Sequence, residues 1–529
     1  MFAGTGSDVG KSVIAAAFCR IFKQDGYSPA PFKAQNMALN SFVTSEGLEI
    51  GRAQAVQAEA AGVPCHTDMN PLLLKPLGDS TSQVVLNGRP TGNQDARTYF
   101  YGQGREALIR EVHAAYDRLS GCYHPIVMEG AGSVSEINLR NVDLVNLPMA
   151  RYAGARVILV ADIDRGGVFA SAYGSIMLQT DEDRRLIKGI LINKFRGDIS
   201  LFTDGVKMME DLCGIPVVGV VPYYKDIYIE EEDSVALRTK KLEALQGKVN
   251  VAVVLLRHMS NFTDFNVLER DERVHLFYTD NTKELQKADI ILLPGTKNTL
   301  DDLYELRRNG VAQAIVQAHR NGAAIMGICG GYQMMGMEVC DPEHVEGDME
   351  RLPGLGLLPV ITRLTEEKVT RRVAFRLAGE ADYLSSGNFS FGGSPMILAD
   401  KGTVVNDVCR GYEIHMGKTT FLPDAKASAF TYPVDVDEHP AGNGGKFADN
   451  IPDASANGCF VNNRCIGTYI HGILDNAPVI DFLLRPFLEK TSARTVFDYA
   501  AFKEEQYDKL AAHVRRHVDM ELIYKILTK

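Results

Sequence analysis

A cysteine followed at once by two glycines is the first candidate for chemistry in this chain. The segment from Gly322 to Ile328 is apolar and fits a buried parallel strand, and Cys329, Gly330 and Gly331 follow it. The glycines allow a sharp turn and leave the sulfur unshielded, and a helix beginning after Tyr332 would direct backbone N–H groups toward it. Such a turn presents a nucleophile and favours the thiolate. The alternative is a buried structural thiol, the usual state of a free cysteine.

A thiol that attacks an amide also needs a base and donors for the oxyanion. We predict His471, which follows a short β-rich run, as the base, with His415 as its competitor. The long separation from Cys329 is no obstacle, because thiol and imidazole need only meet in space. Gly295, in the turn after a strand at 289–293, and Gly330 are predicted to supply the oxyanion hole.

A glycine-rich turn near the start of the chain is typical of a phosphate-binding loop. It ends in Gly-Lys-Ser and leads into an apolar helix. Backbone N–H groups of such a loop surround the phosphates of ATP, the lysine reaches the β and γ oxygens, and the hydroxyl binds Mg²⁺. The distance between its outer glycines is one residue longer than in the standard motif. We predict that this variant loop binds ATP through Gly4, Thr5, Gly10, Lys11 and Ser12.

Polar residues follow several of the apolar runs, where parallel strands would end. In open α/β sheets ligands bind at the carboxyl ends of the strands. Lys33 and Lys75 are therefore predicted to contact an anionic substrate, although solvated lysines are the alternative. Glu129 is predicted to share Mg²⁺ with Ser12, because Mg²⁺ takes hard oxygen ligands. Asn193 is placed to hydrogen-bond a nucleotide base.

The elements that carry these residues alternate as strand and helix. This pattern predicts an α/β chain with an N-terminal P-loop domain built on a doubly wound parallel sheet. Its length of 529 residues is too great for one core. A charged stretch separates two such blocks, so we predict a synthetase domain over 1–230, a linker over 231–247 and a second α/β domain over 248–529 that includes C-terminal helices.

The overall composition favours a cytoplasmic enzyme. A net charge of −11 argues against a nucleic-acid-binding protein or an anionic-membrane binder. The nine cysteines form no C-x-x-C pair, which fits reduced thiols, and no apolar run reaches the length of a membrane span. Only three residues precede Gly4, shorter than the usual strand before a P-loop, so we expect the native chain to begin earlier.

Taken together, the motifs resemble the cobyric acid synthase family, the glutamine-hydrolysing amidases of cobalamin biosynthesis. The resemblance spans essentially the whole chain and is carried by ordered motifs at residues 7–12, 31–41, 129–133, 162–169, 193–198 and 411–417. It implies a dethiobiotin-synthetase-like domain followed by a class I glutamine amidotransferase domain. Glutamine would supply ammonia at Cys329, with His471 as the base.

The resemblance also implies a reaction. ATP would phosphorylate the b, d, e and g carboxylates of adenosylcobyrinic acid a,c-diamide, and ammonia would displace each phosphate to give adenosylcobyric acid. In this scheme Lys11, Ser12 and Glu129 serve ATP and Mg²⁺, and Lys33 and Lys75 steady the substrate or the transferred phosphoryl group.

One position departs from the wider amidotransferase class, which places a glutamate two residues after the histidine. Ile473 stands there, so a third triad residue is unassigned, with Glu413 and Asp475 as weak candidates. A Cys/His pair would still hydrolyse glutamine, because the third group mainly orients the imidazole. The region from about 377 to 405 is the part that the resemblance explains least.

Other readings of the chain stay open. A cobyrinic acid a,c-diamide synthase shares both halves, but the 33–41 stretch favours the later enzyme. A P-loop regulatory ATPase with an inactive amidotransferase module typically has an extra lysine at the front of its loop, which Gly4-Thr5-Gly6 lacks. The whole second half disfavours dethiobiotin synthesis.

Overall fold

The computed structural model describes residues 1–77, 81–230, 243–377, 408–423, 428–433, 458–461, 464–491 and 497–528. It divides into two compact units, Met1–Glu232 with Ala500–Lys529, and Asp233–Tyr499. Most of the 377–405 region lies outside the described residues. None of the helices in the described parts is both long and apolar enough to cross a lipid bilayer.

The first unit is built on a parallel sheet in the order β1 (Phe2–Gly4), β10 (Val157–Asp162), β11 (Ile187–Phe195) and β12 (Val217–Pro222). A parallel pair, β2 (Ala30–Phe32) and β9 (Ile126–Met128), continues it through a bridge between Phe2 and Glu129. The strands are short, apolar and buried, as expected for a sheet covered on both faces. The carboxyl ends of β1 and β9 thus lie side by side.

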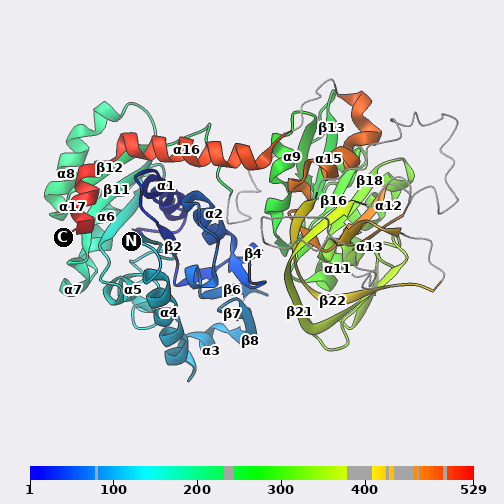
Figure 1. Cartoon of the computed structure of the whole chain (residues 1–529), viewed down its shortest axis with the longest axis horizontal. Coiled ribbons are helices and arrows are strands. Elements are labelled where there is room, and N and C mark those ends of the chain that lie inside the picture. The colour runs from blue at the N-terminus through cyan, green and yellow to red at the C-terminus, as the bar shows by residue number, and fades with distance from the viewer. Residues whose placement is uncertain are drawn as a thin grey trace, which may run out of the picture. The chain divides into compact units, whose positions relative to one another are not determined.

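Helices and a smaller sheet surround this core (Figure 1). The smaller sheet has the order β3 (Gln35–Met37), β6 (Leu72–Pro76), β7 (Thr81–Leu86) and β8 (Arg89–Asp95), and a hairpin joins β4 (Ser41–Val43) to β5 (Glu49–Gly51). The main helices are α1 (Lys11–Gln24), α2 (Arg52–Ala61), α3 (Ala96–Tyr101), α4 (Arg105–Ser120), α5 (Leu147–Tyr152), α6 (Val168–Met177), α7 (Asp181–Arg184) and α8 (Thr203–Cys213).

The C-terminal helices α16 (Tyr499–His517) and α17 (Met520–Thr528) belong almost entirely to the first unit, which corrects our placement of them in the second domain. Tyr507, Leu510, Ala511 and Val514 form an apolar stripe on α16 and join the core around α1. Arg20 on α1 binds Asp508 at 2.7 Å. The sequence shows that this helix has an apolar face, but it does not show which part of the chain covers that face.

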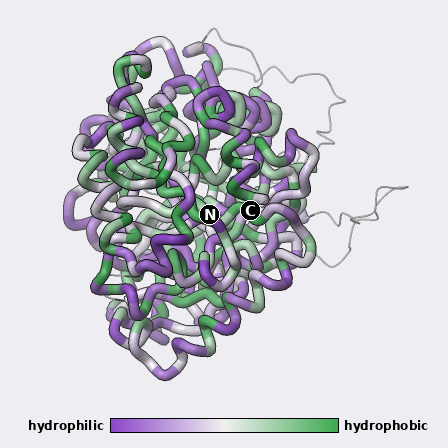
Figure 2. Tube along the Cα trace, turned by 90° about the vertical axis from the view of Figure 1, so that its left-hand side faces the viewer, coloured by the Kyte–Doolittle hydropathy of each residue, from purple (hydrophilic) through white to green (hydrophobic). Residues whose placement is uncertain are grey.

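Hydropathy along the chain agrees with this packing. Figure 2 shows green hydrophobic stretches running through the first unit and purple hydrophilic ones prominent at its outer edge. Both ends of the chain lie within this unit (Figure 1). The P-loop domain is therefore completed by residues far from it in the sequence.

The second unit contains a parallel sheet in the order β15 (Val274–Thr279), β13 (Val249–Val254), β16 (Ile290–Leu293), β18 (Ala324–Ile328) and β26 (Cys465–Thr468), extended by antiparallel β25 (Gly458–Val461) and β23 (Ser428–Ala429). Its helices include α9 (Asn266–Arg270), α10 (Thr282–Leu285), α11 (Thr299–Arg308), α12 (Val311–Arg320), α13 (Gly330–Met335) and α15 (Ala477–Leu484). This matches the α/β class predicted from the sequence.

A second sheet of this unit holds the histidine strand. Its order is β20 (Arg351–Pro353), β19 (Glu338–Cys340), β21 (Val360–Leu377), β22 (Cys409–Phe421) and β27 (Ile470–His471), with β24 (Thr431–Pro433) paired to β21. A short antiparallel pair, β14 (Met259–Ser260) and β17 (Gly295–Thr296), forms a separate two-stranded sheet. These connections bring 259–264, 295–299, 329 and 471 to one end of the parallel sheet.

The packing of α16 gives a stability prediction. Leu510 is 1% exposed in the core that α16 shares with α1, so Leu510→Ala should lower the free energy of unfolding of the first unit by about 2–5 kcal/mol. Lys509→Ala is the matched control, because the Lys509 side chain is half-exposed and its ion pair with Glu505 lies on the surface. Thermal unfolding measures both variants, and equal melting temperatures would contradict the placement of α16.

Candidate active sites

The glycine-rich loop folds back over its own lysine. Lys11, the first residue of α1, directs Nζ to the carbonyl oxygens of Gly6 and Gly132, each at 2.9 Å. Gly10 precedes it with φ 95°, and a Cβ there would lie 2.3 Å from Asn193 Nδ2. Only glycine fits both the left-handed backbone and the close approach. The loop thus has the form of a phosphate cradle at a helix N-terminus.

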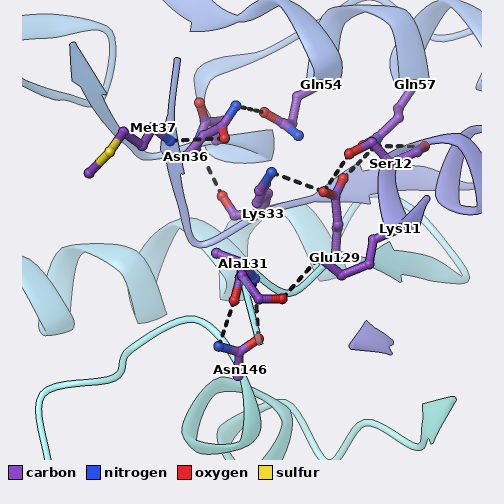
Figure 3. A network of polar contacts seen from close by, with 12 residues as sticks. Lys11, Ser12, Lys33, Asn36, Met37, Gln54, Gln57, Glu129, Ala131 and Asn146 are labelled. Carbon is purple, nitrogen blue, oxygen red and sulfur yellow. Dashed lines mark hydrogen bonds and ion pairs between the residues drawn. The ribbon is translucent and has the colours of Figure 1, made fainter. Parts of the chain in front are cut away.

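A buried carboxylate faces this loop (Figure 3). Glu129 follows β9, and its Oε1 accepts hydrogen bonds from Ser12 Oγ at 2.7 Å and Lys33 Nζ at 2.9 Å, while Oε2 accepts one from Gln57 Nε2 at 2.7 Å. Burial opposes ionisation of Glu129, but the Lys33 charge and the bonds from Gln57 and Ser12 outweigh it and hold its pKa below the usual range. Glu129 is therefore an anion at neutral pH.

Ser12 and Glu129 offer one hydroxyl and one carboxylate oxygen in contact, which is the donor chemistry that Mg²⁺ prefers. The structure thus brings together the two residues predicted to share Mg²⁺, and the metal itself stays a prediction. Gln57, which holds the second carboxylate oxygen, was not predicted. Its signal was weak, because a glutamine within the alanine-rich helix α2 looks like a solvated side chain until the helix is placed.

Asn193, near the end of β11, holds the P-loop by a hydrogen bond. Its Nδ2 donates to the carbonyl oxygen of Val9 at 2.8 Å, and the side chain is buried. The next residue, Lys194, binds Asp162 at 3.1 Å and the carbonyl oxygen of Asp8. One N–H of the Asn193 amide thus supports the loop, and the hydrogen bond from Asn193 to a nucleotide base stays a prediction.

The structure separates the two lysines predicted to bind substrate. Lys33 belongs to the Glu129 cluster, whereas Lys75 on β6 is buried and binds Glu49 Oε1 at 2.7 Å and Ser41 Oγ at 2.9 Å. A buried cation paired with a buried carboxylate has its charge balanced internally. These contacts tie β6 to the β4–β5 hairpin, and contact of Lys75 with substrate stays a prediction.

In the second unit, Cys329 occupies a strained turn between β18 and α13. Its backbone has φ 54° and ψ −114°, a region that non-glycine residues rarely adopt. Room for the turn comes from Gly331, where a Cβ would lie 2.1 Å from the carbonyl oxygen of Leu293. The sulfur lies 3.5 Å from the carbonyl oxygen of Ile414. This is the strand-to-helix elbow predicted from the sequence.

His471 is the imidazole that meets this thiol. Its Nδ1 lies 2.7 Å from Asp264 Oδ2, and Asp264 Oδ1 accepts the backbone N–H of Gly472 at 2.9 Å. Burial lowers the pKa of His471, but the charge and hydrogen bond of Asp264, followed by interactions with Cys329, raise it to about 10. Because Nδ1 faces Asp264, Nε2 is the ring nitrogen left for the thiol.

Asp264 therefore fills the position that Glu413 and Asp475 were weak candidates for. Glu413 binds Arg371 at 2.7 Å, and the competitor His415 stacks on Tyr469 at 3.7 Å between ring centroids. The sequence held one usable signal for Asp264, a polar segment that follows the strand at 249–254, since ligands gather at the carboxyl ends of parallel strands.

The two glycines predicted for the oxyanion hole border the same site. A Cβ at Gly295 would lie 3.3 Å from His471 Cε1, and a Cβ at Gly330 would lie 2.6 Å from Thr296 Cγ2. Gly295 thus lies beside the imidazole, and Gly330 lies beside Thr296, the residue that follows Gly295. The four residues predicted for thiol chemistry, with Asp264 added, form one cluster capable of acyl transfer.

The Asp264 contact predicts how the site responds to pH. Asp264→Asn removes the charge that keeps His471 protonated up to a pH of about 10, so the imidazolium of the variant is lost near neutral pH. We expect alkylation of Cys329 by iodoacetamide at neutral pH to slow at least about tenfold, and glutamine hydrolysis to fall about 10²- to 10⁴-fold. Asp475→Asn is the control, and an equal loss in that variant would reject Asp264 as the histidine partner.

Comparison with known proteins covers both units. A CobQ/CobB/MinD/ParA nucleotide binding domain matches residues 1–235, and a CobB/CobQ-like glutamine amidotransferase domain matches residues 250–479. Curated proteins named cobyric acid synthase are 70% identical in Bacteroides fragilis (100% of this chain, 98% of the relative), 64% in Phocaeicola vulgatus (100% and 98%) and 55% in Parabacteroides distasonis (99% and 97%). The chain belongs to the cobyric acid synthase family.

Proposed function

We propose that this chain amidates the b, d, e and g carboxylates of adenosylcobyrinic acid a,c-diamide, using ATP and glutamine, to give adenosylcobyric acid. The observation that carries the proposal is 70% identity along the whole chain to a relative named cobyric acid synthase. The two sites support it, because one has the residues of a glutaminase and the other those of a P-loop kinase-like centre. An intact Cys329, His471 and Asp264 cluster counts against an inactive amidotransferase module.

In the proposed glutaminase reaction, Cys329 Sγ attacks the side-chain carbonyl carbon of glutamine. Gly295 and Gly330 N–H groups stabilise the oxyanion, and the imidazolium of His471 gives its proton to the nitrogen that leaves as ammonia. Water then cleaves the thioester, releasing glutamate and the free thiol. Asp264 keeps the imidazole oriented and charged throughout.

In the proposed synthetase reaction, a corrinoid carboxylate attacks the γ-phosphorus of ATP and forms an acyl phosphate and ADP. Ammonia then attacks the acyl carbon and phosphate leaves, which makes the amide. Lys11 and Lys33 would balance phosphate charge, and Ser12 and Glu129 would hold Mg²⁺, which when bound neutralises phosphate charge. We assign this domain to residues 1–230 with the C-terminal helices, and the amidotransferase domain to about 248–499.

Cys329→Ala should abolish glutamine-dependent amidation and leave ammonia-dependent amidation intact, because only the ammonia supply needs the thiol. Cys465→Ala is a matched control: Cys465 is also buried and also touches a histidine, with Sγ 3.4 Å from His319 Nε2. Mass spectrometry of corrinoid products with ATP and Mg²⁺ counts the amidations. Persisting glutaminase activity in Cys329→Ala would rule out the assignment.

Lys11→Ala should lose amidation with either nitrogen source while glutamine hydrolysis persists, because Lys11 belongs to the phosphate cradle. The expected fall in the amidation rate is at least about 10²-fold. Lys23→Ala, an exposed lysine in the last turn of the same helix, is the control. If the Lys11 variant formed amide product at the control rate, the P-loop would have no role in the reaction.

A further inference from the structure

A second histidine–carboxylate pair lies close to the glutaminase site. His258 precedes β14, and its Nδ1 lies 3.0 Å from Asp302 Oδ1, while its backbone N–H donates to the same carboxylate at 3.2 Å. Asp302 Oδ2 accepts a hydrogen bond from Thr296 Oγ1 at 2.5 Å. The Asp302 side chain is 1% exposed and that of His258 is 20% exposed. One buried carboxylate of α11 thus joins β14 to β17.

The backbone of His258 adds a second set of ties to the same strand. Its carbonyl oxygen accepts the N–H of Lys297 at 3.0 Å and Thr296 Oγ1 at 3.2 Å. One residue further on, β14 pairs Met259 with Thr296 and Ser260 with Gly295. The short strand that carries Gly295 is therefore held directly by the His258 backbone and by strand pairing with β14, and indirectly by the His258 side chain through Asp302.

Thr296 connects these contacts to the two glycines predicted to form the oxyanion hole. It directly follows Gly295 in the chain, and its Cγ2 occupies the space beside Gly330, where a Cβ would lie only 2.6 Å away. A fixed Thr296 therefore sets the positions of both predicted oxyanion donors. Oxyanion donors stabilise a transition state only when they are held in place before charge develops.

We propose that His258 and Asp302 are positioning residues that fix the oxyanion strand of the glutaminase site. This inference rests on the proposed glutaminase function and on Gly295 and Gly330 as donors. Neither His258 nor Asp302 acts on glutamine itself, since they work through Thr296. The pair is distinct from His471 and Asp264, which serve proton transfer.

The pair carries a pH dependence. The hydrogen bond and charge of Asp302, with a smaller contribution from Asp301, raise the pKa of His258 against burial and the nearby Arg257 charge. Below that raised pKa the ring is a cation that balances Asp302. As pH rises through it, the ring becomes neutral and the tie between β14 and α11 weakens. Glutamine turnover should decline over the same range.

Asp302→Asn tests the proposal. We expect kcat for glutamine hydrolysis to fall about 10- to 100-fold with KM changed less than about threefold, because donor placement matters most in the transition state. Binding of glutamate γ-semialdehyde, whose carbonyl oxygen becomes an oxyanion when Cys329 adds to it, should weaken by a similar factor. Alkylation of Cys329 by iodoacetamide, which needs no oxyanion hole, should stay within about twofold of the unchanged chain.

Asp289→Asn is the matched control, because Asp289 is also a buried carboxylate bound to a cation, Lys490, and a backbone N–H, but at the amino end of β16. His258→Asn keeps a side-chain donor for Asp302 and removes the titration, so the decline of kcat with rising pH should disappear. An unchanged kcat in Asp302→Asn, or loss of alkylation alongside aldehyde binding, overturns the positioning role. Glutaminase activity in Cys329→Ala would instead reject the underlying function.

Discussion

Each unit buries a carboxylate whose charge must be balanced, and this requirement organises both sites. Glu129 and Asp264 are each 2–3% exposed, and burying a charge without a partner costs a large free energy. Lys33, Ser12 and Gln57 surround the first, and His471 with the Gly472 N–H surrounds the second. Balancing the charge also fixes the hydroxyl of Ser12 and the imidazole of His471, the groups the chemistry needs. Removal of one partner would leave an uncompensated buried charge.

Parallel strands explain why these partners come from distant parts of the chain. The P-loop follows β1 and Glu129 follows β9, which are joined by a bridge at Phe2. In the second unit Cys329 follows β18, and Gly295 follows the neighbouring strand β16. Because neighbouring parallel strands end at the same edge, residues separated by more than a hundred positions meet there. The strand order brings the loops together, and the turns after the strands carry the site residues.

Close backbone contacts limit which residues can occupy those turns. The Cys329 elbow needs Gly331 because the chain passes against the carbonyl oxygen of Leu293, and the P-loop needs Gly10 because Asn193 supports it from below. Buried polar side chains hold the neighbouring segments: Asn193 donates to the P-loop, and Asp302 accepts a hydrogen bond from Thr296, whose methyl group lies beside Gly330.

The sequence alone determined the α/β class, the P-loop and the cysteine elbow, because each is encoded by local spacing of glycines and apolar runs. It named His471 as the base but left His415 as a competitor, and only the fold brings His471 to Cys329. It did not identify Asp264 or Gln57, which are ordinary polar residues until a folded neighbour gives them a buried charge to meet. It did not show the buried ion pair of Lys75 with Glu49, since no local pattern connects the two residues. It placed α16 with the wrong unit, because an amphipathic helix shows that it packs but not against what. Only the tertiary structure decided these four assignments, since each depends on contacts between residues far apart in the chain.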